Sequence, residues 1–419
     1  MNLSRYWIRG LALLIILLPS LIQAQNVPIS LDKAVELFQK NSLQRMLLEL
    51  EEERQRGDAQ IYKAFANPEI IVYHESLNAG SPYYDETTIQ LSQPLELFGQ
   101  PFLRNRSASS LNEAAKLEFR YKEQLLIRTL KSLYVEHWFL SHKLNALMEA
   151  AEVVKQAQKS AKARRDEGAY STVQLQRFSI EFSKYQKLAD KVQAQLSDTR
   201  NQLTLMISPQ IDYSQELELN EEFTVIPISE SKESLIEYAL GNRSDIKNLE
   251  FLGEASELQY TVERRERFPD FNINLGYKSQ SNGSEGFVIG GSIKLPLFNQ
   301  NKGNVMSTYA QARTFSTSLE LKNRSVQNEI TLAYQRVVQF AKQWDSVQDF
   351  SGNSTMLETA KTAYQEGAYS LLELLDATEA YVTGQTLFYE TIAEYNQALY
   401  KLDLVSGGNL FSNQQNIDQ

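Results

Sequence analysis

Apolar residues recur at alternating spacings of four and three along two long stretches of the chain. The first seam consists of Leu126, Leu130, Leu133, His137, Leu140, Leu144, Leu147, Ala151 and Val154. About 200 residues later a second seam consists of Val326, Ile330, Ala333, Val337, Phe340, Trp344 and Val347. A repeat of about 3.5 residues that persists over several heptads specifies helices that supercoil around one another. Each stretch is therefore expected to be one long coiled-coil helix.

Glycine and proline positions indicate where these helices end. No proline lies between Pro101 and Pro209, and the sequence Glu-Gly-Ala-Tyr-Ser occurs twice, at 167–171 and 366–370. Its glycine can take the left-handed conformation that commonly terminates a helix. The first long helix, from Phe102 to Glu167, would then measure roughly 100 Å at about 1.5 Å per residue.

A second helix is expected to return from each of these turns. Ser171 with Gln174, and Ser370 with Glu373, have the Ser-x-x-Gln/Glu spacing of a capping box that opens a helix. The return helices are expected to reach about residues 207 and 405. The pattern thus predicts two long antiparallel hairpins.

Most of the chain is one unit of about 200 residues that occurs twice. The turn sequence recurs, and 94–98 (Pro-Leu-Glu-Leu-Phe) recurs in shortened form at 296–298 (Pro-Leu-Phe). The predicted organisation is a signal peptide (1–24), a first repeat (25–207), a linker or equatorial appendage (208–230), a second repeat (231–406) and a polar tail (407–419).

Just before each long helix the period of the pattern changes to two. Apolar residues alternate with polar or small residues in 271–277 and 287–295, and the segments 71–75 and 87–93 precede the first long helix. Strands of about 9–11 residues with one apolar and one polar face are typical of a transmembrane β-barrel. Four strands cannot close a barrel, and lipid does not tolerate an open sheet edge, so several chains are expected to pool their strands. The alternation alone also fits a small soluble sheet that caps a helical body.

The N-terminus predicts export. Arg5 and Arg9 precede the apolar run 11–18, and small and polar residues follow up to Gln25, which is the order of a secretory signal peptide. The apolar run is too short for an ordinary membrane-spanning helix.

Composition and motifs narrow the class of function. The net charge of −10 argues against broad nucleic-acid binding. The absence of cysteine excludes disulfides, cysteine-ligated zinc and iron–sulfur clusters. The chain contains no phosphate loop, nucleophile elbow or His-Glu-x-x-His motif, so neither enzyme activity nor a cofactor is expected.

The duplicated order of short helices, strand pair, long helix, glycine turn and return helix resembles the TolC-type outer-membrane efflux channels. The sequence 93–99 (Gln-Pro-Leu-Glu-Leu-Phe-Gly) and the sequence 366–377, which contains Leu-Leu-Asp-Ala, carry the resemblance. It covers essentially residues 27–406, and the short loops most resemble the CzcC/CusC-type heavy-metal branch. The resemblance implies a mainly α-helical chain whose four strands join those of two other chains in a twelve-stranded barrel of a Gram-negative outer membrane. The helical hairpins would form a periplasmic tunnel.

The resemblance also implies a gate at the second turn. Two acidic positions one helical turn apart line the constriction in this family, and they match Glu373 and Asp376. A homotrimer would thus present a ring of six carboxylates, as in cation-selective pores. A tyrosine nine residues before the first acid matches Tyr364, whereas a basic gate residue of some relatives is replaced by Tyr369. The alternative for Glu373 is a purely capping role; Asp376 has no such explanation.

Partners follow from the same resemblance. A periplasmic adaptor (membrane fusion) protein is expected to contact the two turns, at Gly168, Ala169, Tyr170, Ser171, Gly367, Ala368, Tyr369 and Ser370. The adaptor would connect the duct to an inner-membrane transporter of the RND type, and outer-membrane lipid would surround the barrel.

The three histidines give little evidence of a metal site. His137 lies in the first seam, and the equivalent position of the second seam is Val337, which favours a core histidine. His142 follows at a spacing that suits no shared helical metal site, and His74 on a predicted strand is uninformative.

The sequence therefore predicts a passive outer-membrane exit duct for small solutes, drugs or metal cations. One alternative is the same duct in a type I protein secretion system. The other is a periplasmic coiled-coil scaffold or adhesin without a pore.

Overall fold

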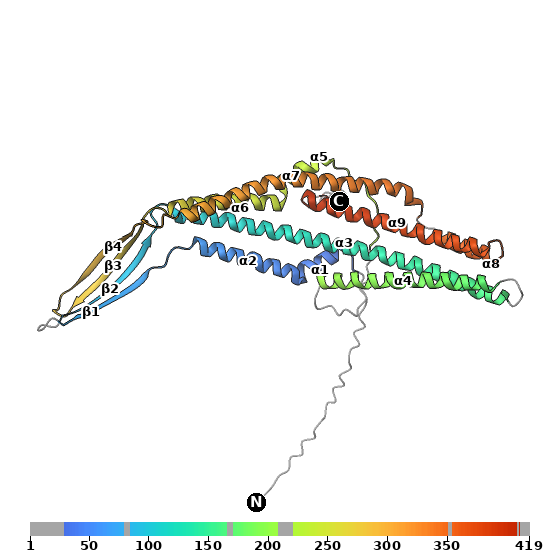
Figure 1. Cartoon of the computed structure of the whole chain (residues 1–419), viewed down its shortest axis with the longest axis horizontal. Coiled ribbons are helices and arrows are strands. Elements are labelled where there is room, and N and C mark those ends of the chain that lie inside the picture. The colour runs from blue at the N-terminus through green and yellow to red at the C-terminus, as the bar shows by residue number, and fades with distance from the viewer. Residues whose placement is uncertain are drawn as a thin grey trace, which may run out of the picture.

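The structure is a computed structural model that describes residues 29–78, 84–165, 171–207, 221–350, 354–408 and 410. The expected leader, the first-turn residues Gly168, Ala169 and Tyr170, and most of the expected tail lie outside the described residues. The described chain is elongated, with a β-sheet at one end and the ends of two pairs of antiparallel helices at the other (Figure 1).

The elements follow one another in the same order in both halves of the chain. Two short helices lead into two strands, and a long helix then leads to a return helix. The first half contains α1 (Leu31–Asn41), α2 (Leu43–Lys63), β1 (Glu69–Leu77), β2 (Tyr84–Leu95), α3 (Gln100–Arg165) and α4 (Thr172–Ile207). The second half contains α5 (Lys232–Asn242), α6 (Ser244–Arg265), β3 (Asp270–Gln280), β4 (Glu285–Lys294), α7 (Lys302–Val347), the 3₁₀ turn η1 (Gln348–Phe350), α8 (Ser354–Gln365) and α9 (Leu371–Ser406).

The two heptad seams form the inner faces of the long helices, as predicted. In α3 the seam residues from Leu140 to Val154 are buried, and in α7 Val326, Ile330 and Val337 are less than 2% exposed. The helix α3 is 66 residues long, which corresponds to about 100 Å. No helix within the described residues is both long enough and apolar enough to cross a membrane.

The expectation of one unbroken long helix in each half is wrong for the second half. There α7 ends at Val347, η1 follows, and a separate helix α8 leads to the turn. The sequence Ser351-Gly352-Asn353, which lies outside the described residues, combines three weak helix formers. The side-chain amide of Gln385 on α9 donates a hydrogen bond of 3.3 Å to the carbonyl of Phe350, which helps to satisfy the interrupted backbone.

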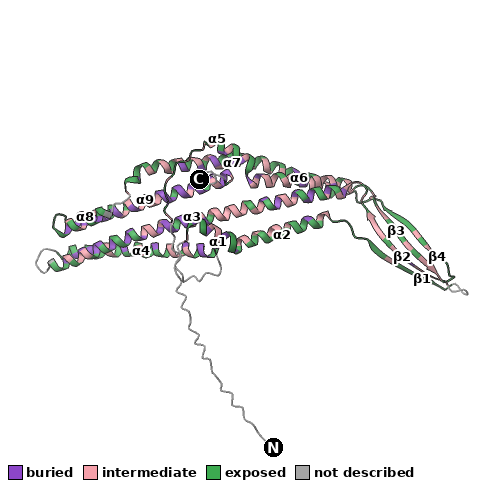
Figure 2. Ribbon diagram, turned by 180° about the vertical axis from the view of Figure 1, so that it is seen from behind, coloured by how far each residue is buried: buried purple, intermediate pink, exposed green. Residues whose placement is uncertain are grey.

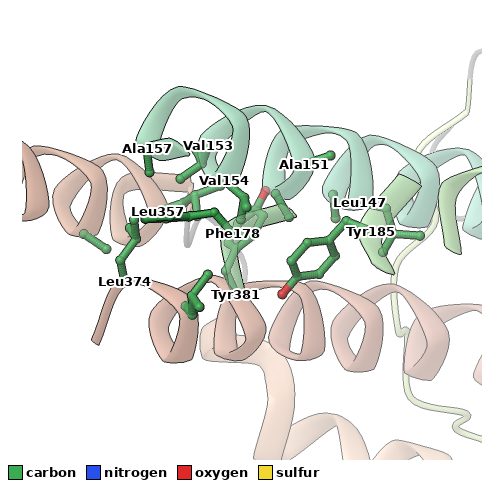
Figure 3. Packing of buried hydrophobic residues seen from close by; sticks show 14 of the residues in the cluster. Leu147, Ala151, Val153, Val154, Ala157, Phe178, Tyr185, Leu357, Leu374 and Tyr381 are labelled. Carbon is green, nitrogen blue, oxygen red and sulfur yellow. The ribbon is translucent and has the colours of Figure 1, made fainter. Parts of the chain in front are cut away.

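The helix α3 is the centre of the helical packing (Figures 1 and 2). Toward the turns, its buried face joins residues of α4, α8 and α9 in one apolar cluster that includes Val154, Phe178, Leu357 and Leu374. Figure 3 shows these side chains converging from different helices. The two hairpins of one chain are therefore held together by a shared core.

The sheet has the strand order β1-β2-β3-β4, and every neighbouring pair is antiparallel. The register places apolar residues opposite one another across all four strands: Val72 pairs with Ile89, Ile89 with Tyr277, and Tyr277 with Phe287. We call the face that carries these residues the apolar face. Its residues Val72, Ile89 and Phe287 are exposed in the single chain, and Figure 2 colours much of the sheet as exposed.

The opposite face of the sheet is mostly polar on β2, β3 and β4, whereas β1 places Ile71, Tyr73 and Leu77 there. Glu86 on β2 forms an ion pair with Lys278 on β3 and accepts a hydrogen bond of 2.9 Å from Gln280. Farther along, the side-chain amide of Asn272 donates to the hydroxyl of Ser292 at 3.2 Å. The alternation predicted from the sequence thus sorts into two chemically distinct faces.

Candidate functional site at the hairpin turns

The second turn joins α8 to α9 through a left-handed glycine. Gly367 has a φ of 81°, and the backbone amides of Ala368 and Tyr369 both donate to the carbonyl of Ala363, at 2.8 and 3.0 Å. This pattern terminates α8 in the way that the Glu-Gly-Ala-Tyr-Ser sequence predicts.

Ser370 and Glu373 form the predicted capping box at the start of α9. The Ser370 hydroxyl accepts from the backbone amide of Glu373 at 3.4 Å, and the Glu373 carboxylate accepts from the backbone amide of Ser370 at 2.7 Å. The Ser370 backbone amide and then its side chain lower the pKa of Glu373, because both hydrogen bonds favour the ionised carboxylate.

The cap at the start of α4, in the first hairpin, has the same hydrogen bonds as the cap of α9 but no charged group. The backbone amide of Ser171 donates to Gln174 at 2.9 Å, and the Ser171 hydroxyl accepts from the backbone amide of Gln174 at 3.3 Å. A neutral amide therefore caps α4 in the way that a carboxylate caps α9. Capping alone does not require an acid at position 373.

Asp376 lies one turn farther along α9. Its side chain is exposed, as is that of Glu373, whereas Leu374 between them is fully buried. Residues three apart lie on one helix face, so the two carboxylates project from the same exposed side of α9. Within the described residues, no hydrogen bond or ion pair involves the Asp376 carboxylate.

The structure does not bring Tyr364 to the face that carries the acids. Tyr364 is only 2% exposed and belongs to the cluster that joins the two hairpins. Its ring meets that of Phe178 on α4 edge to face, with centroids 6.0 Å apart. Tyr364 therefore has a packing role in the single chain, and its gate role stays a prediction.

Both turns present exposed apolar side chains at equivalent positions. Val173 follows Ser171 by two residues, Leu372 follows Ser370 by two residues, and both are exposed, together with Tyr369. Large apolar side chains in contact with water at two matched helix starts are suited to bind another protein.

Two polar contacts between the hairpins could not be foreseen from the sequence. The hydroxyl of Tyr381 on α9 donates to the carboxylate of Glu149 on α3, and Lys184 on α4 lies 3.4 Å from Glu379 on α9. The residues of each contact come from different hairpins, and a local pattern does not identify a partner on another hairpin.

The histidines lie apart from one another. His137 is buried with Nδ1 3.1 Å from the Thr199 hydroxyl, as expected of a core residue, and the His142 ring stacks on that of Tyr389. Within the described part of the chain, no three His, Asp or Glu side chains gather closely enough to hold a metal ion.

Known proteins share this architecture. Residues 235–408 match the family model described as outer membrane efflux protein. The cobalt-zinc-cadmium resistance protein CzcC of Cupriavidus metallidurans is 20% identical over 387 residues, which cover 91% of this chain and 90% of that protein.

Two solved structures have a similar fold. A membrane protein from Pseudomonas aeruginosa superposes with a TM-score of 0.77 at 16% identity, covering 90% of this chain and 93% of that one. The Campylobacter jejuni CmeC outer membrane channel superposes with a TM-score of 0.75 at 18% identity, covering 92% of this chain and 88% of that one.

Proposed function

We propose that this chain is a member of the outer membrane efflux protein family, whose model matches residues 235–408, and that three copies form a passive exit duct for small solutes. Membership in this family locates the chain in the outer membrane, with its helices extending into the periplasm. The observation that carries the proposal is the two-faced sheet at the end of long helical hairpins.

The sheet supports pooling of strands from several copies. Its four strands leave two open edges, and an unpaired edge in hydrocarbon costs several kcal/mol for each unsatisfied backbone group. Three copies supply twelve strands and remove every edge. The apolar face then contacts lipid, and the face with Glu86, Lys278 and Asn272 lines an aqueous lumen.

The hairpins supply the tunnel wall and its periplasmic entrance. With three copies, the exposed pairs of Glu373 and Asp376 form a ring of six carboxylates that attracts cations and holds them at the entrance. The exposed apolar residues of both turns are the docking surface for a periplasmic adaptor. The adaptor connects the duct to an inner-membrane transporter of the RND type, which supplies the energy.

Divalent metal cations are the first candidates for the exported solute. The relative CzcC is a cobalt-zinc-cadmium resistance protein, and a carboxylate ring suits such cations. Drug-like organic solutes are the second candidates.

The test is conductance of the purified protein in planar lipid bilayers, with and without divalent cations. We expect the wild-type channel to be blocked by Co²⁺ from the side of the hairpin turns. The double variant Glu373→Gln/Asp376→Asn should need roughly tenfold more Co²⁺ for half-block, which corresponds to about 1.4 kcal/mol. Gln preserves the cap, because Gln174 already performs that role in the first hairpin.

A matched control separates the ring from general charge. Glu358→Gln/Glu366→Gln removes two exposed carboxylates from α8 and the turn, near the same tip, and should leave the block unchanged. If Co²⁺ blocks the wild type and both variants equally, the two acids do not bind cations and only cap α9 and keep its first turns hydrated. Absence of any current from the wild-type protein would refute the duct and favour a scaffold.

A further inference from the structure

Exposed apolar side chains occur in the segments that connect the sheet to the helices. We call six of them the collar: Phe65, Leu97, Phe268, Leu295, Leu297 and Phe298. Phe298 is 100% exposed, Phe65 73% and Leu297 69%. Each Å² of such surface in water costs about 25 cal/mol, and several exposed apolar side chains in one part of a molecule mark an interaction surface.

The collar is continuous with the apolar face of the sheet. The ring of Phe98 stacks on that of Phe268 with centroids 4.6 Å apart, and its centroid lies 6.4 Å from that of Phe271. Phe271 belongs to the apolar face, where it pairs with Ile293 on β4. At these residues no polar side chain separates the apolar face from the collar. A molecule that covers the apolar face can therefore also contact the collar.

The apolar face alone is too short for a membrane. Its apolar row runs from Phe271 to Tyr277 on β3 and from Ile293 to Phe287 on β4. Six residue steps at about 3.3 Å, tilted by about 40°, cover roughly 15 Å along the membrane normal. Barrels of the outer membrane carry an apolar band about 25 Å tall, so about 10 Å are missing.

The missing height cannot come from the end of the sheet near the strand-connecting loops. On the same face, that end carries the polar side chains of His74, Asp85, Ser279 and Glu285. The Tyr277 hydroxyl already donates to Glu285 there at 2.6 Å, as a tyrosine at a membrane–water boundary does. The apolar band can therefore be extended only toward the helices.

We propose that the collar is embedded in the periplasmic leaflet of the outer membrane, in contact with phospholipid acyl chains. The membrane boundary then lies beyond the strand ends, where the helices begin, and the collar supplies the missing height of the apolar band. This inference rests on the proposed function, because it requires the sheet to lie in the membrane.

The experiment uses single cysteines in the mature full-length protein, which has no native cysteine. Phe298→Cys, Ile289→Cys and Asn328→Cys place a polarity-sensitive nitrobenzoxadiazole label on the collar, on the apolar face and on the exposed side of α7. The labelled proteins are reconstituted into phosphatidylethanolamine/phosphatidylglycerol vesicles that contain lipids with a spin-label quencher at a shallow or a deep acyl position. Channel conductance confirms that each labelled protein is assembled, and Leu297→Cys replaces Phe298→Cys if the latter does not assemble.

We expect the labels at 298 and 289 to emit as in an apolar medium and to be quenched at least twofold by the lipid quenchers. The label at 298 should respond more to the shallow quencher and the label at 289 more to the deep one, whereas the label at 328 should report water.

Three results would overturn the proposal in different ways. A label at 298 that reports water, while the label at 289 is quenched, would refute the collar and leave the duct intact. A label at 298 that is dry but not quenched by lipid would show that another copy of the chain covers it. A label at 289 that is not quenched would refute the membrane-embedded sheet and, with it, the proposed function.

Discussion

The buried histidine of the first seam makes the stability of the helical body depend on pH. His137 on α3 is 7% exposed, and its Nδ1 lies 3.1 Å from the Thr199 hydroxyl on α4. Burial and, to a smaller extent, the positive charge of Arg200 on α4 lower the pKa of His137, while the Leu196 backbone raises it, and together they bring this pKa to about 4.

The sign and size of the effect follow from proton linkage. An unfolded chain protonates this histidine near its ordinary pKa of 6.5, whereas the folded chain resists protonation until about pH 4. The folded state therefore has its full stability above about pH 6.5. It loses stability as the pH falls from about 6.5 to about 4, and below pH 4 this histidine lowers the stability no further. A difference of about 2.5 pKa units corresponds to roughly 3 kcal/mol per chain.

The decisive perturbation is His137→Leu. Leucine matches the neighbouring seam residues, and the Thr199 hydroxyl keeps its hydrogen bond of 3.0 Å to the Leu196 carbonyl, so no buried donor is orphaned. Between pH 7.5 and pH 4, we expect the free energy of unfolding to fall by roughly 3 kcal/mol less in the variant than in the wild type. Carboxyl groups whose pKa is raised by burial, such as that of Asp403, are common to both proteins and cancel in the comparison.

The assay is urea unfolding of the detergent-solubilised protein, followed by tryptophan fluorescence at a series of pH values. Trp138 adjoins the mutated site and is 5% exposed, so its emission reports the opening of this part of the core. The matched variant Val337→His places a histidine at the buried seam position of α7. It should make the free energy of unfolding fall more steeply at low pH. Equal pH dependence in the wild type and His137→Leu would refute the reasoning.

Two further substitutions test the packing at the opposite ends of the molecule. Phe178→Ala, at a fully buried position of α4, should cost about 3–5 kcal/mol in urea unfolding, whereas Val173→Ala at an exposed position of the same helix should change it little. Gly276→Ala would place a Cβ 2.6 Å from the Ile89 carbonyl oxygen and should reduce the yield of folded protein in outer-membrane fractions; Gly286→Ala meets nothing within 4 Å and should not.

Features that depend only on residues close together in the sequence could be predicted. The two seams were identified because a heptad period is visible within one helix, and they are the buried faces of α3 and α7. Both capping boxes were identified because their residues lie three positions apart, within one helical turn. The strand faces were identified from the period of two, although strand pairing across the two halves required the structure.

Features that depend on distant partners were not predictable. The second long helix is interrupted where its heptad seam ends, at Val347 just before η1 begins, and the end of a seam does not by itself show that the helix ends there. The spacing of nine residues before Glu373 matches Tyr364 to a gate position of the family pattern, but it does not reveal that the Tyr364 ring packs against Phe178 of the other hairpin. The pairing of Lys184 with Glu379 joins residues 195 positions apart, and no local pattern encodes such a distance.

The matched caps of the two hairpins have a consequence for symmetry. In the proposed trimer the same cap would occur six times at the entrance, because each chain forms it once at the start of α4 and once at the start of α9. The charge of the caps would repeat only three times, because Gln174 caps α4 where Glu373 caps α9. A protein that recognises the shape of the caps would therefore find six similar positions, whereas a cation would find three acidic positions and three neutral ones.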